Sequence, residues 1–550
     1  MNSDAAKSKR LDQLTALRFF AAIMVVFHHL AGTFGVKSMP LNLGQGVSFF
    51  FVLSGFILAY VYPRFNSSSE IRRFFWARWA RLFPAYLAAF LIGAILTSYV
   101  WSPGTLIAHL TMLQGWIPVS AYYFSYNGVA WSVSTEFFFY VVFPLLMLLQ
   151  PKASGALLFF AAAALLAWLL LVERLGLPDY GSPATADGMK ITQNGLIYIS
   201  PVSRIFEFIF GAVVAGFWRS RAWNWTLRFS TLAELGAILL CFFSIYYTGV
   251  ASREVAATMG QAAATWLMHS GSFLAFGVLV FVFAVGRGWV SKMLTNPLLV
   301  VLGEISFSVY LIHNIFLAFY LKNAADFYWL SDSVGLATFF GVLLVSSYLI
   351  WFGVERPGRR ILMRSGSVGS QSATASRHVQ ASGYAAMASV LFLMAFSGFS
   401  YWKGFGPIGE RSARAMTSDQ SADFIGANFS GIFELRGVSF SCREKDLIAR
   451  LVWKKTGVVS ASLSHAVHVI GPEGAILGQA DYSQADRVRH MKLGKMWVDN
   501  VLVRPAQVPS KATALAVGIV GENGKLMKID HSKTDWEGHR LVIPFDRCNE

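Results

Sequence analysis

This chain of 550 residues has few charged residues: Asp, Glu, Lys and Arg together make up 14%, whereas hydrophobic residues make up 55%. So little charge excludes an ordinary soluble protein and is typical of a chain that crosses a membrane many times. Acidic residues are scarcer than basic ones, and the formal net charge is +16. That excess lies in short segments between apolar runs and not in a basic soluble domain, which argues against nucleic-acid binding.

The sequence also lacks a recognisable cleavable signal peptide. Its first apolar run follows KSKR, contains Arg18 and is not closed by a small-residue cleavage site. We therefore predict a retained first span with the N-terminus in the cytoplasm. Cysteines are few, only three, and Cys241 lies in an apolar run where packing explains it. Cys442 and Cys548 bracket the C-terminal region and can pair if that region lies outside the cytoplasm, but their spacing does not establish a disulfide.

Apolar runs predict an α-helical polytopic membrane bundle of about eleven transmembrane helices. The runs lie near residues 14–33, 44–62, 84–101, 132–150, 154–172, 200–217, 232–248, 271–286, 297–321, 335–353 and 383–400. The segment near 105–117 is too short and too broken to span, and we expect it to be interfacial or re-entrant. We divide the chain into a membrane domain over 1–362 with about ten spans, a cytoplasmic linker over 363–382, an eleventh transmembrane helix over 383–402, a linker over 403–420 and a C-terminal domain over 421–550.

Basic residues mark the loops that we expect to be cytoplasmic. They follow the second, sixth, eighth and tenth predicted spans, whereas the segment 173–199 after the fifth span carries acidic residues. The basic residues are Arg64, Arg72, Arg73, Arg78, Arg81, Arg219, Arg221, Arg228, Arg287, Lys292, Arg356, Arg359, Arg360, Arg364 and Arg377. With an odd number of spans, this pattern places the C-terminus outside.

Residues 421–550 follow a different pattern. Strand-like runs occur in GIFELRGVSF, DLIARLVWKK, KMWVDNVLV and HRLVIPF, and turn signals such as GPEG at 471–474 and GENGK at 521–525 separate several of them. This pattern predicts a C-terminal β-sandwich domain. The odd number of predicted spans makes that domain extracytoplasmic.

Two ionisable residues lie within the first apolar run. Arg18 and His29 are eleven residues apart, which puts them about 20° apart around a helix, whereas His28 lies about 80° from Arg18. Ionisable groups in a bilayer are costly and usually face a protein interior or a wet cavity. Because His29 shares a helical face with Arg18, it is a better candidate than His28 for a functional residue. A neutral imidazole is the usual general base for activating a hydroxyl. The alternative is that Arg18 snorkels to the headgroups and His29 is a satisfied buried donor.

A second basic motif is the RxxR of WARWARLFP. It places Arg78 and Arg81 on one helical face just before the third predicted span. Guanidinium forks suit phosphate groups, so the pair is a candidate phosphate site. Determination of membrane topology is the alternative role.

Acidic residues occur inside two later spans. Glu136 in WSVSTEFFFYVVFP lies just inside the apolar region, with Ser132 one turn earlier, and its charge needs a partner. In the sixth span, Arg204 and Glu207 are spaced i, i+3. They form either a self-satisfied ion pair or part of a site.

The ninth span carries a polar stripe. Ser306, Tyr310 and His313 in LGEISFSVYLIH follow at i, i+4 and i+7, so they share a face that we expect to point into the bundle.

Depth along the spans predicts one polar layer in the outer half of the membrane. Its members are His29, Glu136, Arg204, Glu207 and His313. Arg78 and Arg81 are predicted to lie on the opposite, cytoplasmic side.

Seven fragments resemble, in this order, the acyltransferase-3 family of multi-span membrane acyltransferases. They are RFFAAIMVVFHH, GVSFFFVLSGFILAY, WARWARLFPAY, WSVSTEFFFYVVFP, SRIFEFIFGAVVAG, LGEISFSVYLIH and VERPGRR, within about residues 11–360. The resemblance implies a ten-span enzyme that moves acyl groups, usually acetyl, from cytoplasmic acyl-coenzyme A (acyl-CoA) to sugars of surface or secreted glycans.

The resemblance also implies roles for particular residues. His29 is expected to activate the attacking hydroxyl or to relay the acyl group, with Arg18 and Glu136 shaping the site, and Arg78 and Arg81 are expected to hold the phosphates of coenzyme A. The supporting residues are His28, Ser54, Arg204, Glu207, Ser306, Tyr310 and His313.

The sequence therefore predicts an O-acyltransferase of the bacterial inner membrane, acetyl-CoA-dependent, acting on an exopolysaccharide, O-antigen or similar glycan. The donor is expected to be a substrate, with no bound cofactor, no metal and no nucleic-acid partner. Two alternatives are a transporter of an acyl or glycan substrate, since intramembrane Arg, His and Glu also mark transport paths, and a glycan-sensing membrane protein.

The C-terminal domain departs from one arrangement found in the family. It shows no GDS-type opening of an SGNH esterase, so we assign it no second catalytic step. The run HVIGPEGAILGQADY followed by KMWVDNVLV faintly resembles β-sandwich domains attached to some membrane glycosyltransferases. Glycan binding and a purely structural cap are the two interpretations.

Overall fold

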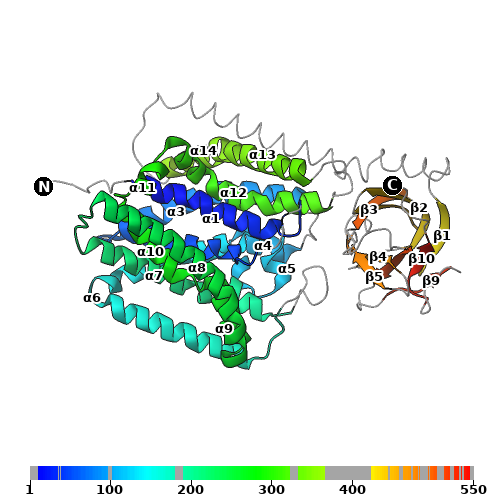
Figure 1. Ribbon diagram of the computed structural model, residues 1–550, viewed down its shortest axis with the longest axis horizontal. Coiled ribbons are helices and arrows are strands. Elements are labelled where there is room, and N and C mark those ends of the chain that lie inside the picture. The colour runs from blue at the N-terminus through cyan, green and yellow to red at the C-terminus, as the bar shows by residue number, and fades with distance from the viewer. Residues whose placement is uncertain are drawn as a thin grey trace.

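The computed structural model contains a helical region and a strand-rich C-terminal region (Figure 1). It describes residues 10–34, 36, 39–96, 102–179, 190–322, 332–365, 423–443, 446–457, 463–471, 475–480, 482–483, 493–494, 496–503, 513–520, 526–531, 534 and 538–544. The predicted eleventh span over 383–402 and the linker over 403–420 lie outside the described residues, as do the turns at 472–474 and 521–525.

Short and long helices make up most of the described part of residues 10–365. They are α1 (Asp12–Leu30), η1 (Leu43–Gln45), α2 (Gly46–Val61), α3 (Ser68–Leu96), α4 (Pro103–Leu110), η2 (Gln114–Trp116), α5 (Ser120–Tyr123), α6 (Trp131–Arg174), η4 (Gly195–Ile199), α7 (Pro201–Arg219), α8 (Leu227–Met259), α9 (Gln261–Ser270), α10 (Phe273–Val285), α11 (Trp289–Leu294), α12 (Pro297–Lys322), α13 (Asp332–Ile350), η6 (Trp351–Glu355) and α14 (Arg356–Ser365). Among the described residues, ten helical segments are long and apolar enough to cross a membrane. They correspond to the first ten predicted spans, and the broken segment near 105–117 forms only α4 and η2.

The arginine-rich segment before the third span is helical, so its prediction as a loop is wrong. It forms the first half of α3, which continues through Pro84 to Leu96. Hydropathy marked only the apolar second half of this helix. The first half is amphipathic, because Phe74 and Arg78 are buried while Arg72 and Arg73 are exposed.

The fourth and fifth predicted spans, Trp131–Leu148 and Gly155–Arg174, both lie within α6, which is not one straight helix. The ring of Trp131, at its start, lies 4.6 Å from the ring of Tyr198. Trp168, near its other end, donates from Nε1 to the carbonyl of Leu196 at 3.2 Å. In a straight helix these two tryptophans would be about 55 Å apart, so the two halves must run side by side.

Two other spans are interrupted inside the bundle. The eighth begins with α9, earlier than predicted, and breaks at Gly271 and Ser272 before α10. The sixth begins with the π-helix η4 and breaks at Ser200 before α7. Irregular backbone at membrane depth needs polar partners from the protein. Gln45 supplies one, since its Oε1 accepts from the backbone N–H of Ser272 at 2.9 Å.

Close backbone contacts hold the helices that carry the polar motifs. A Cβ on Gly55 of α2 would lie 2.0 Å from the carbonyl oxygen of Phe208, and one on Gly211 of α7 would lie 2.0 Å from that of Val52. A Cβ on Gly303 of α12 would lie 2.0 Å from the carbonyl oxygen of Thr15 in α1. Small residues therefore allow α2 to pack on α7 and α12 on α1, as in other membrane bundles.

The C-terminal region is a β-sandwich, as predicted. One antiparallel sheet has the order β7 (Met496–Val503), β3 (Asp446–Lys455), β2 (Phe433–Arg443), β1 (Asp423–Phe429) and β9 (Ile529–Asp530). The other has the order β10 (Leu541–Pro544), β8 (Ala514–Val520), β4 (Ser464–Ile470) and β5 (Ile476–Gln479), with β6 (Tyr482–Ser483) also paired to β4. Residues of both sheets share one hydrophobic core that includes Trp453, Trp497 and Val517.

The four strand-like runs noted in the sequence correspond to β2, β3, β7 and β10. Cys442 lies on β2, whereas Cys548 lies outside the described residues, so the disulfide stays a prediction. Cys241 is a buried free thiol in α8.

Candidate active site

A cavity of about 80 Å³ lies inside the helical bundle, between α1, α2, α3, α6 and α12. Five different helices contribute its lining, so it forms only when the bundle is assembled. The lining residues are Arg18, Val47, Phe50, Phe51, Leu53, Ser54, Ile57, Leu58, Arg78, Arg81, Ser132, Val133, Glu136, Tyr140, Phe307 and Tyr310. Most of the polar residues singled out from the sequence therefore meet at one place.

Three arginines give the cavity an excess of positive charge. Arg18, Arg78 and Arg81 line it together with a single acid, Glu136. Arg78 is buried, its guanidinium lies 5.6 Å from the ring centre of Tyr62, and its Nε has no hydrogen-bond partner in the described part of the chain. A buried guanidinium with an unused donor is suited to an anionic ligand.

Glu136 is held from two helices. Its Oε1 accepts a short hydrogen bond from the Tyr140 hydroxyl, one turn later on α6, and the Ser54 hydroxyl of α2 lies 3.4 Å away. It also interacts electrostatically with Arg18 and Arg81. The charge of this carboxylate is thus matched by nearby guanidiniums.

The position of Glu136 corrects the predicted polar layer. Glu136 shares a cavity with Arg78 and Arg81 and does not lie opposite them. The prediction assumed that α6 begins at the surface of the membrane. Instead α6 begins inside the bundle, where Trp131 is only 2% exposed and Ser134 donates to the carbonyl of Met112, in the chain that covers this end.

Sequence reasoning missed a second acid beside the cavity. Glu355, in η6, interacts electrostatically with Arg18, Arg81 and Arg359, and Ser308 of α12 donates to it at 3.5 Å. It belongs to the fragment VERPGRR, so the signal was present. The arginines of this fragment were interpreted as markers of a cytoplasmic loop, and the acid beside them was not considered as a site residue.

Two histidines lie near the lining residue Tyr310. Tyr310 lines the cavity, and its hydroxyl lies 2.7 Å from the Ser132 hydroxyl. The backbone carbonyl of Tyr310 accepts from Nδ1 of His313 at 2.6 Å. Nε2 of His313 lies 3.2 Å from Nδ1 of His29. His29 and His313 therefore lie just beyond the cavity lining, on α1 and α12.

The other two candidates near these histidines have different surroundings. His28 is exposed, whereas His29 is half-buried. Ser306 is fully buried, but its hydroxyl donates to the carbonyl of Gly303 on its own helix, and it does not line the cavity.

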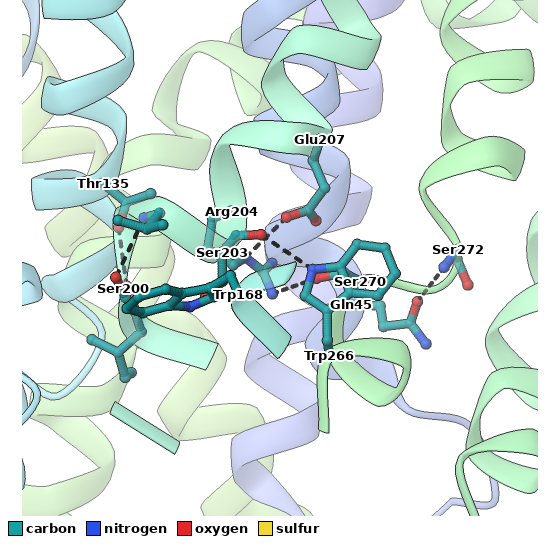
Figure 2. Close-up of polar contacts among 12 residues, drawn as sticks. Gln45, Thr135, Trp168, Ser200, Ser203, Arg204, Glu207, Trp266, Ser270 and Ser272 are labelled. Carbon is teal, nitrogen blue, oxygen red and sulfur yellow. Dashed lines mark hydrogen bonds and ion pairs between the residues drawn. The ribbon is translucent and has the colours of Figure 1, made fainter. Parts of the chain in front are cut away.

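Arg204 and Glu207 form the predicted ion pair, which Figure 2 shows at the break between α9 and α10. Arg204 Nε lies 3.0 Å from Glu207 Oε2, and Arg204 Nη1 donates to the Ser270 hydroxyl at 2.7 Å. The guanidinium also lies 5.1 Å from the ring centre of Phe51, whose side chain lines the cavity. The pair therefore does not line the cavity itself but packs against Phe51, which does.

Comparison with known proteins shows the family of the helical region. The family model described as an acyltransferase domain, that of the acyltransferase-3 family, matches residues 11–356. The chain belongs to this family. All the cavity-lining residues fall within the matched acyltransferase domain, and the β-sandwich lies beyond it. A curated relative, acyltransferase MdmB of Streptomyces mycarofaciens, is 28% identical over 379 residues, covering 64% of this chain and 93% of the relative. No solved structure matches.

Proposed function

We propose that this acyltransferase is a membrane O-acyltransferase that moves an acetyl group from cytoplasmic acetyl-CoA to a hydroxyl of a surface or secreted glycan. Acyltransferase activity follows from the family. The donor, the acyl group, the acceptor and the location in a bacterial inner membrane are proposals, supported by the fragments shared with the family and by the arrangement of the cavity.

One observation carries the proposal: α1 places Arg18 in the cavity lining and His29, about three turns further along the same helix, in contact with His313. Arg18 and His29 lie eleven residues apart on α1, or about 16 Å along the helix axis. An extended pantetheine arm is of this length. Phosphates bound at Arg18, Arg78 and Arg81 would therefore allow the thioester to reach the level of His29.

The loop charges support the sidedness of this arrangement. Basic residues such as Arg64, Arg219 and Arg287 follow even-numbered spans, which favours a cytoplasmic location for the end of the bundle nearest Arg18. The donor would enter there, and the acceptor would reach His29 from the opposite side.

The arrangement of the residues supports direct transfer of the acyl group from the thioester to the acceptor hydroxyl in one step. His29 takes the proton of the acceptor hydroxyl as the oxygen attacks the thioester carbonyl carbon. The carbon–sulfur bond then breaks, an ester is formed, and the proton passes from His29 to the departing thiolate to give coenzyme A. The arginines hold the donor and do not take part in bond changes.

Release of free thiol from acetyl-CoA tests the proposal. Purified protein in nanodiscs is assayed with a panel of O-antigen, exopolysaccharide and simple glycoside acceptors, wild type beside His29→Ala and His28→Ala. We expect acceptor-stimulated release that is abolished by His29→Ala and largely kept by His28→Ala. Equal activity of the two variants would reject His29 as the base, and no release with any acceptor from folded wild type would reject the proposed function.

A further inference from the structure

The contact between His29 and His313 joins helices that are far apart in the sequence. It is made possible by the close packing of α12 on α1 at Gly303. His29 Nδ1 lies 2.9 Å from the carbonyl oxygen of Val25 and 3.2 Å from Nε2 of His313. His313 Nδ1 lies 2.6 Å from the carbonyl oxygen of Tyr310.

These contacts determine where the protons lie. A carbonyl oxygen only accepts hydrogen bonds, so Nδ1 of His313 must carry a proton and donate to Tyr310. In the neutral ring, Nε2 of His313 is then an acceptor. Nδ1 of His29 faces two acceptors, Val25 and His313, and must carry its proton as well. Neutral His29 is therefore protonated on Nδ1, and its Nε2 holds a lone pair.

The free nitrogen of His29 is the one that can meet a substrate. Across the described residues Nε2 of His29 has no hydrogen-bond partner, and the side chain is half-buried. His313, in contrast, is 0% exposed and both of its nitrogens are engaged. His313 therefore cannot itself take a proton from an acceptor hydroxyl without breaking one of these bonds.

We propose that His313 is a positioning residue that fixes the tautomer and orientation of His29, so that Nε2 of His29 faces the reacting groups as a base. This role rests on the proposed function of His29. When His29 takes a proton it becomes a cation, and its Nδ1–H bond to the lone pair of His313 strengthens. His313 thus contributes to the transfer step and not to donor binding, which takes place at the arginines.

Two substitutions of His313 separate this role from simple packing. His313→Gln keeps an acceptor for His29 and a donor for Tyr310, whereas His313→Leu fills similar space without either. His109→Gln is the matched control, because His109 is also 0% exposed, lies outside the cavity lining and has its Nε2 2.8 Å from the Ser125 hydroxyl. Each variant is assayed in nanodiscs with acetyl-CoA and the acceptor most active with wild type.

We expect His313→Leu to lower kcat by about 10- to 100-fold, less than the loss on removing His29. The KM for acetyl-CoA should change by less than about twofold. His313→Gln should recover part of kcat, and His109→Gln should leave kcat near that of wild type. Unchanged kcat in folded His313→Leu, or equal losses in the Leu and Gln variants, would overturn the proposal while leaving the proposed function intact.

A second measurement needs no turnover. In protein labelled with ¹⁵N-histidine, the signals of His29 are identified by their loss in His29→Ala. We expect a protonated Nδ1 and an unprotonated Nε2 in wild type, and a mixture of tautomers in His313→Leu. The opposite tautomer in wild type would overturn the proposal even if the protein transferred no acyl group.

Discussion

Arg204 and Glu207 form an ion pair in which neither side chain is exposed, one turn apart on α7. The guanidinium also donates a hydrogen bond to Ser270, and it lies 5.1 Å from the ring centre of Phe51 and 5.7 Å from that of Tyr198. Through these contacts one arginine joins α7 to α2, to η4 and to the break between α9 and α10. Arg204 therefore stabilises the packing of the sixth and eighth spans at the breaks where each of them loses helical hydrogen bonds.

Removing one partner of this pair should destabilise the protein more than removing both. Arg204→Met leaves the Glu207 carboxylate buried without a counter-charge, and Glu207→Gln leaves the Arg204 guanidinium buried without one. Each single change should cost about 3–5 kcal/mol, because an uncompensated buried charge is expensive, and the double variant should cost less than the sum. Thermal unfolding in detergent measures this, with exposed Arg221→Met as the control. Additive losses would show that the pair is not coupled.

Glycines at the crossing of α2 and α7 should tolerate no side chain. A methyl group on Gly211 would meet the carbonyl oxygen of Val52 at 2.0 Å, so Gly211→Ala should force the helices apart and lower the melting temperature. Gly236→Ala on α8 is the matched control, since nothing lies within 4 Å of its added Cβ. The control should be neutral or stabilising by up to about 1 kcal/mol. Equal effects of the two changes would argue against tight packing at the crossing.

The spans could be predicted because hydropathy depends on local sequence alone. The ion pair between Arg204 and Glu207 could likewise be predicted, because their i, i+3 spacing puts both side chains on one face of a helix. Alternation in the C-terminal region marked four strands, including β2 and β3, because a sandwich strand buries one face.

What could not be predicted depends on how distant segments pack. The depth of Glu136 follows from residues 102–130 covering the start of α6, which no periodicity reveals. Glu355 joins the arginines only because η6 packs beside α3. The first half of α3 looked like a loop because its arginines hide the helical pattern, although Phe74 and Arg78 form the buried face.

The β-sandwich should lose stability in mild acid because of His465. This side chain is 1% exposed in the core, 5.0 Å from the ring centre of Trp453, and burial lowers its pKa from 6.5 to about 4. The unfolded domain binds a proton below about pH 6.5, whereas the folded domain stays neutral down to about pH 4. Protonation therefore favours the unfolded state, and stability should fall as the pH is lowered from about 6.5 to about 4.

Hydrogen exchange of peptides from β4 in the full-length protein measures this effect, with His465→Leu as the comparison. The variant should lose most of the pH dependence in that interval, because no titratable group remains at the position. Identical acid sensitivity in both proteins would assign the effect to another group.

The predicted disulfide between Cys442 and Cys548 can be tested by thiol labelling. Both cysteines should resist alkylation in folded, unreduced protein and react after reduction, if the C-terminal domain lies in an oxidising compartment. Cys241, which is a buried free thiol, should become reactive on unfolding without reduction. Ready labelling of Cys442 and Cys548 before reduction would exclude the bond.

Donor binding should depend on the arginines of α3 that face the cavity and not on those that face away. Arg78→Ala and Arg81→Ala each remove a guanidinium from the cavity lining, so the Kd for acetyl-CoA should rise by about tenfold or more for each. Arg72→Ala and Arg73→Ala remove the same charge from the same helix at exposed positions, and the Kd should change by less than about threefold. Equilibrium binding of labelled donor to nanodisc-embedded protein separates the pairs. If all four variants weaken binding alike, the effect is long-range attraction of an anion by a basic surface; a loss confined to Arg78 and Arg81 instead assigns the phosphates to the cavity.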